Sequence, residues 1–558
     1  MSEMRRVIVV LWIIFLSAPV VRSQDADNVK YIAELLSKEP EDLTEEEIVQ
    51  YLDLLRKPIR LNMASKSQLS ECGLFTRHQV ASLMDYKERS GQILSYMELS
   101  AVDGFGDDLV CRIRPFVSLD QTMELGGKAD HEITVRTALR SSSGENRYSY
   151  ASRYKVKSGE LISASVALSR SLDSKTSIPD AYCASLGMRF RRLPVKIVVG
   201  DFNVRYGQGL ALWSGTDFSS LNDPSTFMRR SSGVSVTSSF TGTKMLTGTA
   251  AELNLGRFSV SAIAGFTGLK TVANKPEKLV FQPALHIDYA WRYGQIGFTQ
   301  TALQKSSVDM SACFKGVDVF SELMFDWKDR RLAGLAGVVF PAGDMVKIAA
   351  MLRSQYPEHL AALSVSMSDR KRISGTFSSE ATMYSEPKVD TQDMSLQVKI
   401  HTQWQLSLIR SLVLKLRVTE RVRSWGDTYR TDLRADLLWQ SGLFNSTMRL
   451  NVLNCKSTSF LTYLEGGFKS ERLSIYLRQG LFLIDDWSDR IYAYERDVPG
   501  CYNSPAFYGR GVWTSCMTSW KVSKVCKLYF RAGYTAYPFM EEKKPGKAEL
   551  RFQTVLDF

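Results

Sequence analysis

Cysteine and histidine are scarce in this chain of 558 residues, and long hydrophobic runs are almost absent. Eight cysteines over such a length form no disulfide scaffold, although Cys516 and Cys526 lie on neighbouring predicted strands and are a candidate pair in an oxidising compartment. The five histidines show no metal-ligand spacing, so we expect neither a metal site nor a cofactor. No apolar run reaches the roughly 18 residues of a membrane-spanning helix, which argues against a helical membrane protein. The 44% hydrophobic content is that of a folded chain, and the length predicts at least two domains.

The N-terminus has the three parts of an export signal. Arg5 and Arg6 precede an apolar stretch, residues 7–15, and the small side chains of Val21 and Ser23 mark a cleavage site. The alternative, a membrane anchor helix, is disfavoured because the apolar stretch is too short to span a bilayer. Residues 1–23 are therefore predicted to be a signal peptide.

Residues 24–120 are predicted to form a small helical domain. Apolar side chains recur there with a period near 3.6, as on one face of an amphipathic helix. Three helix starts are marked by a Ser or Thr followed three residues later by Glu or Gln, the pattern of a capping box. These are Thr44 with Glu47, Ser65 with Gln68, and Ser95 with Glu98.

Two consecutive helix pairs in this domain resemble the tandem helix-hairpin-helix of competence-type DNA receptors. The resemblance is carried by residues 61–69, by the helix around Tyr86 with Gly91 after it, and by residues 99–106. In that family a Gly-hydrophobic-Gly turn points backbone N–H groups at a DNA phosphate. The resemblance therefore implies a helix-hairpin-helix fold and makes DNA a candidate partner.

The two hairpins differ at this turn. The second keeps it as Gly104, Phe105 and Gly106, which the resemblance marks as phosphate-contacting residues. The first has Leu74 and Thr76 where the glycines belong, so its amides are less free to approach a phosphate. Only the second hairpin is thus a candidate DNA contact.

The charge of the domain argues against DNA binding. Residues 24–120 contain 11 Lys or Arg and 18 Asp or Glu, a net of −7, and Asp107 and Asp108 directly follow the intact turn. Phosphate binding is chiefly electrostatic and needs a positive surface. Two interpretations remain open: a DNA-contacting turn, or a compact module that docks a periplasmic protein and uses its hairpin for packing.

Residues 121–558 are predicted to form an outer-membrane β-barrel. Apolar side chains alternate with polar or charged ones in segments of about ten residues, the pattern of membrane-spanning strands. Clear examples are residues 394–401, 412–419, 473–478 and 526–532. A soluble β-sandwich or propeller would show the same period, but the Lys and Arg that recur on the inner face suit a wet lumen better than a packed core. We expect an antiparallel barrel of about 22–26 strands.

The C-terminus supports this location. Residues 550–558 alternate to the last position, and Phe552, Leu556 and Phe558 resemble the signal that barrel-insertion machinery reads on outer-membrane proteins. With the export signal, this predicts an outer-membrane protein whose helical domain lies in the periplasm. The chain outside residues 24–120 carries +19. That charge suits contact with lipopolysaccharide phosphates at the membrane surface, or a lumen that favours anions.

Two stretches between predicted strands stand out. Residues 201–230 are too long for a strand pair and either fold inward as a constriction or form an ordinary surface loop, the interpretation we prefer; the candidate lumen residues are Arg205, Tyr206, Gln208 and Trp213. Residues 485–511 contain three close aspartates, which suit a solvated loop better than a Ca²⁺ site because further oxygen ligands are lacking. Both stretches resemble segments of a Gram-negative family that joins a periplasmic helix-hairpin-helix region to a barrel, a resemblance that implies no particular activity.

Four functions are compatible with these features. The first is a conduit or envelope-interaction component, with the helical domain on its periplasmic side as plug, tether or receiver. The alternative is DNA uptake with the hairpins receiving DNA at the periplasmic face. A third, an enzyme in the barrel wall, is not expected because His286 and His401 have no recognisable nucleophile near them in the sequence. The fourth is an assembly component with a closed barrel. We favour the first.

Overall fold

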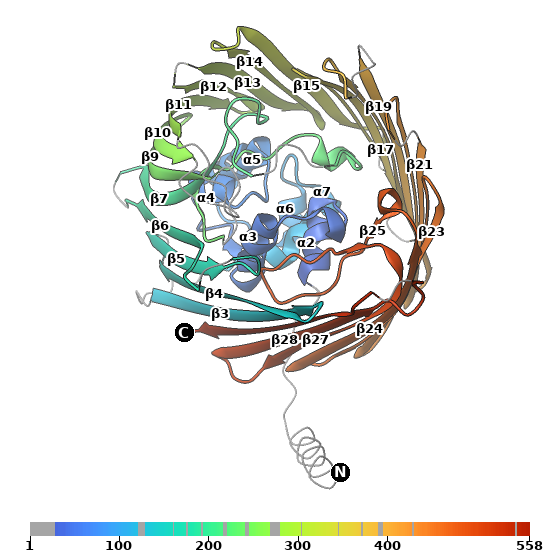
Figure 1. Cartoon of the computed structure of the whole chain (residues 1–558). Coiled ribbons are helices and arrows are strands. Elements are labelled where there is room, and N and C mark those ends of the chain that lie inside the picture. Colours follow the sequence, from blue (N-terminus) through green and yellow to red (C-terminus); the bar gives the residue numbers. More distant parts are fainter. Residues whose placement is uncertain are drawn as a thin grey trace.

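A computed structural model describes residues 28–120 and 129–558, apart from 160, 175–176, 191–192, 216–219, 240–244, 268–279, 303, 344, 370–371, 389–393, 427–428 and 542–543. The predicted signal peptide, residues 1–23, lies outside the described residues. None of the described helices combines the length and the apolar character needed to cross a membrane. The chain folds as a large β-barrel with a small helical domain (Figure 1).

The barrel wall consists of 24 antiparallel strands, which confirms the predicted fold class and strand number. Its last strand pairs with its first, with Leu550 opposite Leu139, so the wall is closed. The strands are β3 (Ala129–Ser142), β4 (Glu145–Ser158), β5 (Ile162–Arg170), β6 (Ala181–Arg189), β7 (Val195–Arg205), β9 (Leu246–Leu255), β10 (Phe258–Thr267), β11 (Val280–Trp291), β12 (Gly294–Thr301), β13 (Lys305–Phe314), β14 (Val317–Asp326), β15 (Arg331–Pro341), β16 (Val346–Gln355), β17 (Glu358–Ser368), β18 (Ile373–Tyr384), β19 (Ser395–Ile409), β20 (Leu412–Arg423), β21 (Tyr429–Ser441), β22 (Phe444–Asn454), β23 (Thr458–Lys469), β24 (Leu473–Ile484), β27 (Gly509–Lys521), β28 (Cys526–Ala536) and β29 (Lys547–Asp557).

The two faces of the wall differ as the alternating pattern predicts. In β24, Leu477 is 56% exposed on the outside, whereas its neighbours Tyr476 and Arg478 are buried on the inside. Exposed Leu, Ile, Val and Phe side chains recur in this way on strand after strand. A closed wall leaves no unpaired strand edge in lipid, and an apolar exterior over a polar interior is the architecture of an outer-membrane barrel. The barrel therefore spans the outer membrane.

The two ends of the barrel are also distinct. At the end where β3 begins and β29 finishes, neighbouring strands are joined by two to five residues. The opposite end carries the long connections, including residues 206–245 and 485–508. Outer-membrane barrels have short periplasmic turns and longer extracellular loops. The end with the long connections is therefore the extracellular one.

The helical domain has a core of its own, built from side chains such as Ile32, Leu83 and Leu99. The predicted capping boxes at Thr44 and Ser65 are both complete, whereas Ser95 accepts only the bond from the Glu98 N–H. Its elements are α2 (Asn28–Leu36), η2 (Pro40–Asp42), α3 (Glu45–Arg56), α4 (Lys66–Glu71), α5 (Arg77–Ser90), α6 (Tyr96–Ser100), α7 (Gly106–Ile113) and η3 (Arg114–Phe116), with a short parallel pair β1 (Ile59–Arg60) and β2 (Val117–Ser118).

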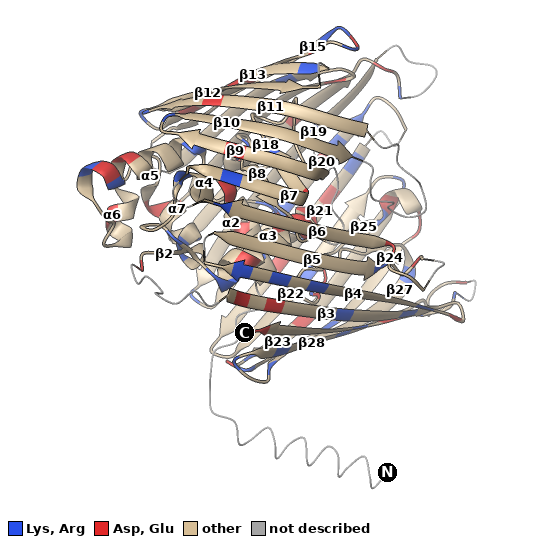
Figure 2. Cartoon of the chain, turned by 90° about the vertical axis from the view of Figure 1, so that its left-hand side faces the viewer, with Lys and Arg blue, Asp and Glu red and all other residues tan. Residues whose placement is uncertain are grey.

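This domain lies inside the barrel, not beside it in the periplasm as expected from the sequence (Figure 1). Figure 2 shows that its α5–α6 end projects beyond the short-turn end of the wall, so this end reaches the periplasmic side. The physical reason is the pairing of acidic side chains of the domain with basic side chains of the lumen. We call residues 28–72 the docked end and residues 88–115 the projecting end.

Two chain segments between strands fold into the lumen beside the domain. The inner loop, residues 206–239, is buried where it leaves β7, and it carries β8 (Gly233–Val236) and η4 (Pro224–Thr226). Across the lumen, Ser364 of β17 donates to the Asn222 carbonyl at 3.2 Å. The inner loop is thus not the ordinary surface loop that the sequence favoured.

The strap, residues 485–508, enters the lumen from the other side and carries η5 (Trp487–Asp489), β25 (Ile491–Tyr492) and β26 (Ala506–Phe507). Its aspartates have protein partners: Asp485 pairs with Arg510, and the buried Asp489, unlike a residue of the solvated loop expected from the sequence, accepts bonds from the Lys456 and Ser457 amides. Among the described residues no metal-ligand cluster occurs.

The predicted cysteine pair is wrong. On β27 Cys516 lies opposite Ala532 of β28, and Cys526 begins β28 at the other end of the pairing, so the two thiols are far apart along the strands. None of the eight cysteines forms a disulfide.

Candidate functional site in the barrel lumen

Ion pairs join the helical domain to strands on several sides of the lumen. Acidic side chains come mostly from the domain and basic ones mostly from the wall, which explains why the chain divides into an acidic and a basic part. The pairs are Asp53 with Lys155 of β4, Glu71 with Arg189 of β6 and Lys196 of β7, Glu46 with Arg205 of β7, Glu39 with Arg434 of β21, and Glu41 with Arg434 and Arg449 of β22. Three pairs have the opposite polarity: Arg56 with Glu132 and Lys57 with Asp130, both of β3, and Arg77 with Asp288 of β11.

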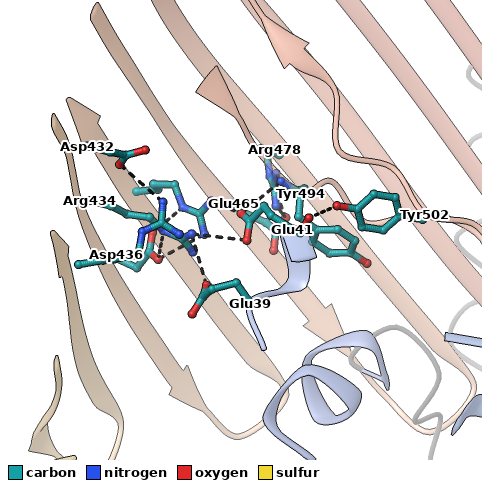
Figure 3. A network of polar contacts seen from close by, with 11 residues as sticks. Glu39, Glu41, Asp432, Arg434, Asp436, Glu465, Arg478, Tyr494 and Tyr502 are labelled. Carbon is teal, nitrogen blue, oxygen red and sulfur yellow. Dashed lines mark hydrogen bonds and ion pairs between the residues drawn. The ribbon is translucent and has the colours of Figure 1, made fainter. Parts of the chain in front are cut away.

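The densest of these contacts is formed by the η2 turn of the domain (Figure 3). The Arg449 Nη1 lies 2.6 Å from the Glu41 Oε1, and the Arg434 Nη1 lies 3.4 Å from both Glu39 and Glu41. Asp436, on the same strand as Arg434, pairs with both arginines: its carboxylate oxygens lie 2.7 Å from the Arg434 Nε and 2.6 Å from the Arg449 Nε. Asp436 thereby helps to hold both guanidinium groups in position. We call these five residues the latch.

The strap closes over the latch from a third direction. The Tyr494 N–H donates to the Glu41 Oε1 at 3.3 Å, and the Tyr502 hydroxyl donates to the Glu41 carbonyl. Arg478 of β24 donates to the Tyr494 carbonyl at 2.6 Å and pairs with Glu465, so it holds the strap to the wall (Figure 3). Domain, wall and strap therefore meet at a single carboxylate.

Electrostatics keeps the latch carboxyls ionised. Burial by itself raises the pKa of Glu39 and Glu41, but the attraction of Arg434 and its basic neighbours outweighs it, and the pKa of both lies below the ordinary 4.5. Burial, followed by repulsion from Glu39 and Glu41, raises the pKa of the adjacent Asp42. A buried pair of this kind adds little net stability, but removing one partner leaves an uncompensated charge that costs about 3–5 kcal/mol.

A second cluster fixes the far side of the docked end. The Lys155 Nζ lies 2.7 Å from the Asp53 Oδ2, and Glu132 bridges Arg56 at 2.6 Å and Arg153 at 3.3 Å. Burial alone raises the pKa of Asp53, yet Lys155 and the nearby basic side chains lower it far below its ordinary value. The lysines and arginines of the lumen therefore act as counterions of the domain.

The four candidate lumen residues lie at the end of β7 and at the start of the inner loop. Arg205 reaches the domain, with its Nη2 3.5 Å from Glu46, and the guanidinium carbons of Arg205 and Arg229 lie 5.9 Å and 4.5 Å from the centre of the Trp213 ring. Tyr206 stacks on His286 of β11 with ring centroids 3.9 Å apart. These side chains are packed inside the barrel, and their contact with a passing molecule stays a proposal.

The Gly207–Gly209 part of the inner loop wraps around one carboxylate of the wall. Glu322 of β14 accepts the N–H groups of Gln208, Leu210 and Ala211 at 2.7, 3.1 and 3.2 Å. A Cβ at Gly207 would lie 2.8 Å from a Glu322 oxygen, and the φ of +59° is unfavourable for any other residue. Glycine is thus required for this anchor.

The Gly104–Gly106 turn lies at the projecting end of the domain. Both glycines have positive φ and are exposed, whereas Phe105 is buried against Phe75 with ring centroids 5.6 Å apart. The Gly104 carbonyl accepts a bond from Gln79 at 2.8 Å. The phenylalanine of the turn therefore packs into the core, and any phosphate contact by the glycine amides stays a proposal.

The C-terminal residues close the wall. Phe552 and Phe558 are exposed on the outer face, and Leu556 is half-buried. The Phe558 N–H and carbonyl bond to His131 at 3.0 and 2.8 Å across the seam between β29 and β3. Reading of these residues by insertion machinery stays a prediction.

The latch arginines were missed in the sequence. Their signal is present: Arg430, Asp432, Arg434 and Asp436 occupy every second position of one strand, facing the lumen. The matching acidic run, residues 39–42, lies almost four hundred positions earlier. Nothing in either segment alone reveals that the two meet.

Among known proteins, similarity is found to solved structures. No family model and no curated protein matches the chain. The P pilus usher translocation pore (PapC) matches 77% of this chain and 99% of its own at 7% identity, with a TM-score of 0.42. The siderophore receptor PirA of Pseudomonas aeruginosa matches 78% of this chain and 82% of its own, at 9% identity and a TM-score of 0.41. The copper transporter OprC matches 78% of this chain and 81% of its own, at 8% identity and a TM-score of 0.40. Likenesses of this size carry no information on what this barrel binds or passes.

Proposed function

We propose that this protein is an outer-membrane conduit whose lumen is closed by its own N-terminal domain, which acts as a removable plug. The observation that carries the proposal is the set of ion pairs that joins the docked end of the domain to strands on several sides of the wall. A domain that served only as a periplasmic tether would need no such fit to the lumen.

The chemistry of the contact supports movement as well as closure. Interfaces that are permanent are usually apolar, whereas this one is formed largely by charged side chains that water can solvate after release. The domain also keeps a core of its own, so it can leave the wall without unfolding. The barrel wall is closed independently of the domain, through the pairing of β3 and β29.

The test is ionic conductance of the full-length protein in planar bilayers. We expect the wild-type barrel to be closed or nearly so, and a Glu39→Lys/Glu41→Lys variant to conduct, because reversed charges face Arg434 and Arg449. The matched control is Glu88→Lys/Asp107→Lys, which makes the same change of charge at the projecting end. This control should stay closed.

A cysteine tether makes the test specific for plug movement. The Ser37 and Ser225 hydroxyl oxygens, on the domain and the inner loop, are 2.9 Å apart, so a Ser37→Cys/Ser225→Cys pair can form a disulfide. Added to the Glu39→Lys/Glu41→Lys variant, the oxidised tether should abolish conductance and reduction should restore it. A wild-type barrel that conducts as well as the charge-reversed variant, or a tether without effect, contradicts the proposal.

DNA uptake is the second candidate, and one observation favours it. The Gly104–Gly106 turn is exposed at the periplasmic side, where DNA emerging from the lumen would meet it. The surrounding Asp103, Asp107 and Asp108 oppose it, because their charge repels a phosphate. Salt-dependent retention of DNA by the full-length protein separates the two candidates.

A further inference from the structure

A row of basic side chains crosses three neighbouring strands of the wall near the extracellular end. Arg421 of β20 lies directly opposite Lys399 of β19 on one side and Arg430 of β21 on the other. Lys399 bonds to Asn222 of the inner loop and Arg430 to the strap, so the row faces the lumen. Like charges directly opposite each other destabilise a sheet. The row therefore has a cost in stability that an anion beside it would offset.

The two outer members of the row have protein partners, but the central one has none. The Lys399 Nζ lies 2.8 Å from the Glu380 Oε1, and the Arg430 Nη2 donates to the Arg490 carbonyl at 2.9 Å. Among the described residues Arg421 forms no hydrogen bond or ion pair, and it is only half-buried. Its guanidinium group can therefore bind a molecule that comes from the lumen.

Two further arginines add positive charge beside this row. Arg423, two positions farther along β20, and Arg490 of the strap lie within electrostatic range of Arg421. The Arg423 Nε donates to the Gln397 side chain at 2.8 Å, and the Arg490 Nε to the Tyr492 hydroxyl at 3.0 Å. Hydrogen bonds to neutral groups hold these cations in position without cancelling their charge. The four residues Arg421, Arg423, Arg430 and Arg490 are called the arginine cluster below.

Two carboxylates act on the arginine cluster, and both are already engaged elsewhere. Asp432 lies 3.6 Å from the Arg417 Nη2, on the side of the latch. Asp489 accepts the backbone N–H groups of Lys456 and Ser457 at 3.1 and 2.9 Å. Within the described part of the chain the cluster therefore keeps an excess of positive charge. A recess lined by one sign of charge concentrates the opposite ion.

We propose that the arginine cluster binds the phosphate group of a solute that enters the lumen from the extracellular side. The inference rests on the proposed function, for which it names the class of substrate. A guanidinium group presents paired N–H donors that match the oxygens of a phosphate, and this cluster presents them from two strands and the strap. Rings of Arg or Lys are the usual lining of anion and phosphate pores.

The position of the cluster fits entry from outside. Arg430 precedes the latch residue Arg434 by four positions on β21, which places it about 13 Å farther toward the extracellular end. A phosphate bound there lies between the mouth of the barrel and the latch. The phosphates of lipid headgroups do not reach it, because the row faces the lumen and not the membrane.

The experiment is isothermal titration of the full-length protein in a nonionic detergent at low salt. The ligands are inorganic phosphate and glycerol 3-phosphate, with acetate and glycerol for comparison. We expect a Kd of about 10 μM to 1 mM for at least one phosphate ligand, binding of acetate at least tenfold weaker, and no binding of glycerol. Tighter binding of the ester assigns the site to organic phosphates, and tighter binding of the free ion assigns it to inorganic phosphate.

Substitutions of Arg421 locate the binding. Arg421→Gln should weaken phosphate binding about fivefold or more, and Arg421→Lys should weaken it less because the charge is kept and only the paired donors are lost. Arg410→Gln is the matched control: Arg410 is exposed in the periplasmic turn that precedes the same strand, and its loss changes the charge by the same amount. This control should leave the affinity unchanged.

Thermal unfolding separates a binding residue from a structural one. Without phosphate, the thermal midpoint of Arg421→Gln should equal or exceed that of the wild type, because the substitution relieves repulsion from Lys399 and Arg430. Phosphate should raise the midpoint of the wild type and not that of the variant, since a ligand stabilises only the protein that binds it. A lower midpoint of Arg421→Gln in the absence of ligand, no binding of either phosphate ligand, or equal affinity in Arg421→Gln and Arg410→Gln overturns the inference.

Failure of this inference and failure of the plug can be told apart. A barrel that gates through the latch but binds neither phosphate ligand refutes the phosphate site alone. A barrel that binds phosphate through Arg421 but does not conduct when its latch charges are reversed refutes the conduit and leaves the arginine cluster as a binding site at the barrel mouth.

Discussion

The docked and projecting ends of the helical domain both contain more acidic than basic side chains, but they lie in opposite surroundings. At the docked end the Glu41 side chain is 11% exposed and paired with two arginines, whereas at the projecting end the Asp103 side chain is 65% exposed. Leu94 and Met97, also at the projecting end, are 76% and 85% exposed. The net charge of −7 of residues 24–120 therefore includes acidic side chains on two different surfaces: one is neutralised by the basic side chains of the lumen, and the other is exposed on the periplasmic side.

Low pH should remove the difference between the two ends. The pKa values of Glu39, Glu41, Asp53 and Glu71 are lowered in the docked state, so docking is favoured above the ordinary carboxyl pKa and weakens as the pH falls below about 4.5. Asp42, with its raised pKa, opposes this trend but is one group against four. Fluorescence anisotropy of a label on the exposed Cys111 measures domain mobility and should fall between pH 5 and about pH 3. In the protein with the oxidised Ser37→Cys/Ser225→Cys tether, the anisotropy should not change with pH. A fall of the anisotropy in both the tethered and the untethered protein would show that the barrel itself is unfolding.

Glu41→Gln tests the docked end at its most connected residue. The neutral side chain leaves Arg434 and Arg449 with too little negative charge, and we expect docking to weaken by about 3 kcal/mol. The measurement is hydrogen exchange of the docked-end amides, which should become faster by about a hundredfold at pH 7. Glu88→Gln is the control at the projecting end, and equal exchange in the two variants would remove the distinction between the ends.

Gly207→Ala tests whether the inner loop is held by its carboxylate anchor. The added Cβ meets Glu322, and the backbone is strained by about 1–2 kcal/mol because of its positive φ. Gly256→Ala is a matched control, since Gly256 has the same φ of +59° with nothing within 4 Å of its Cβ. The thermal midpoint should fall for both and further for Gly207→Ala, and protease should cut the inner loop only in that variant. An equal fall of the thermal midpoint in the two variants would mean that the contact with Glu322 contributes nothing to stability.

Substitutions at the projecting end should change the stability of the protein least. Leu94→Ser/Met97→Ser is expected to change stability by less than about 0.5 kcal/mol, because both side chains are already in water. The full-length protein should also show no salt-dependent binding of duplex DNA, with or without Gly106→Ala. Gly106 has no neighbour within 4 Å of its Cβ, so this variant tests the turn without a steric clash. Binding at low salt that Gly106→Ala abolishes would make DNA uptake the leading function.

Much of the fold was predictable because it depends on local periodicity. The alternation in residues 473–478 and the capping boxes at Thr44 and Ser65 are visible in a few consecutive residues, and each gives the expected strand or helix. The position of the domain was not predictable. It depends on pairs such as Glu41 with Arg449, which are separated by 408 positions, and a local pattern holds no information on such a pair.

The candidate site was predictable to a lesser degree. The sequence indicated that residues 201–230 are unusual, because their length and glycine content fit no strand pair, but not that Glu322 binds their amides. The excess positive charge of the barrel was assigned to lipopolysaccharide or to an anion-favouring lumen. The structure instead pairs much of it with the acidic domain, as at Lys155 and Asp53. The net charge of a segment indicates that it has counterions, but it does not identify the groups that supply them.

The seam between β29 and β3 has a consequence for biogenesis. The helical domain precedes β3 in the chain, so it is synthesised before any strand, whereas the wall closes only when the last residues reach His131. The domain must therefore be enclosed as the sheet curls around it, or enter through one open end afterwards. In the first route the basic side chains of successive strands pair with their acidic partners in the order of the strands. The folded domain then serves as a template that sets the circumference of the barrel.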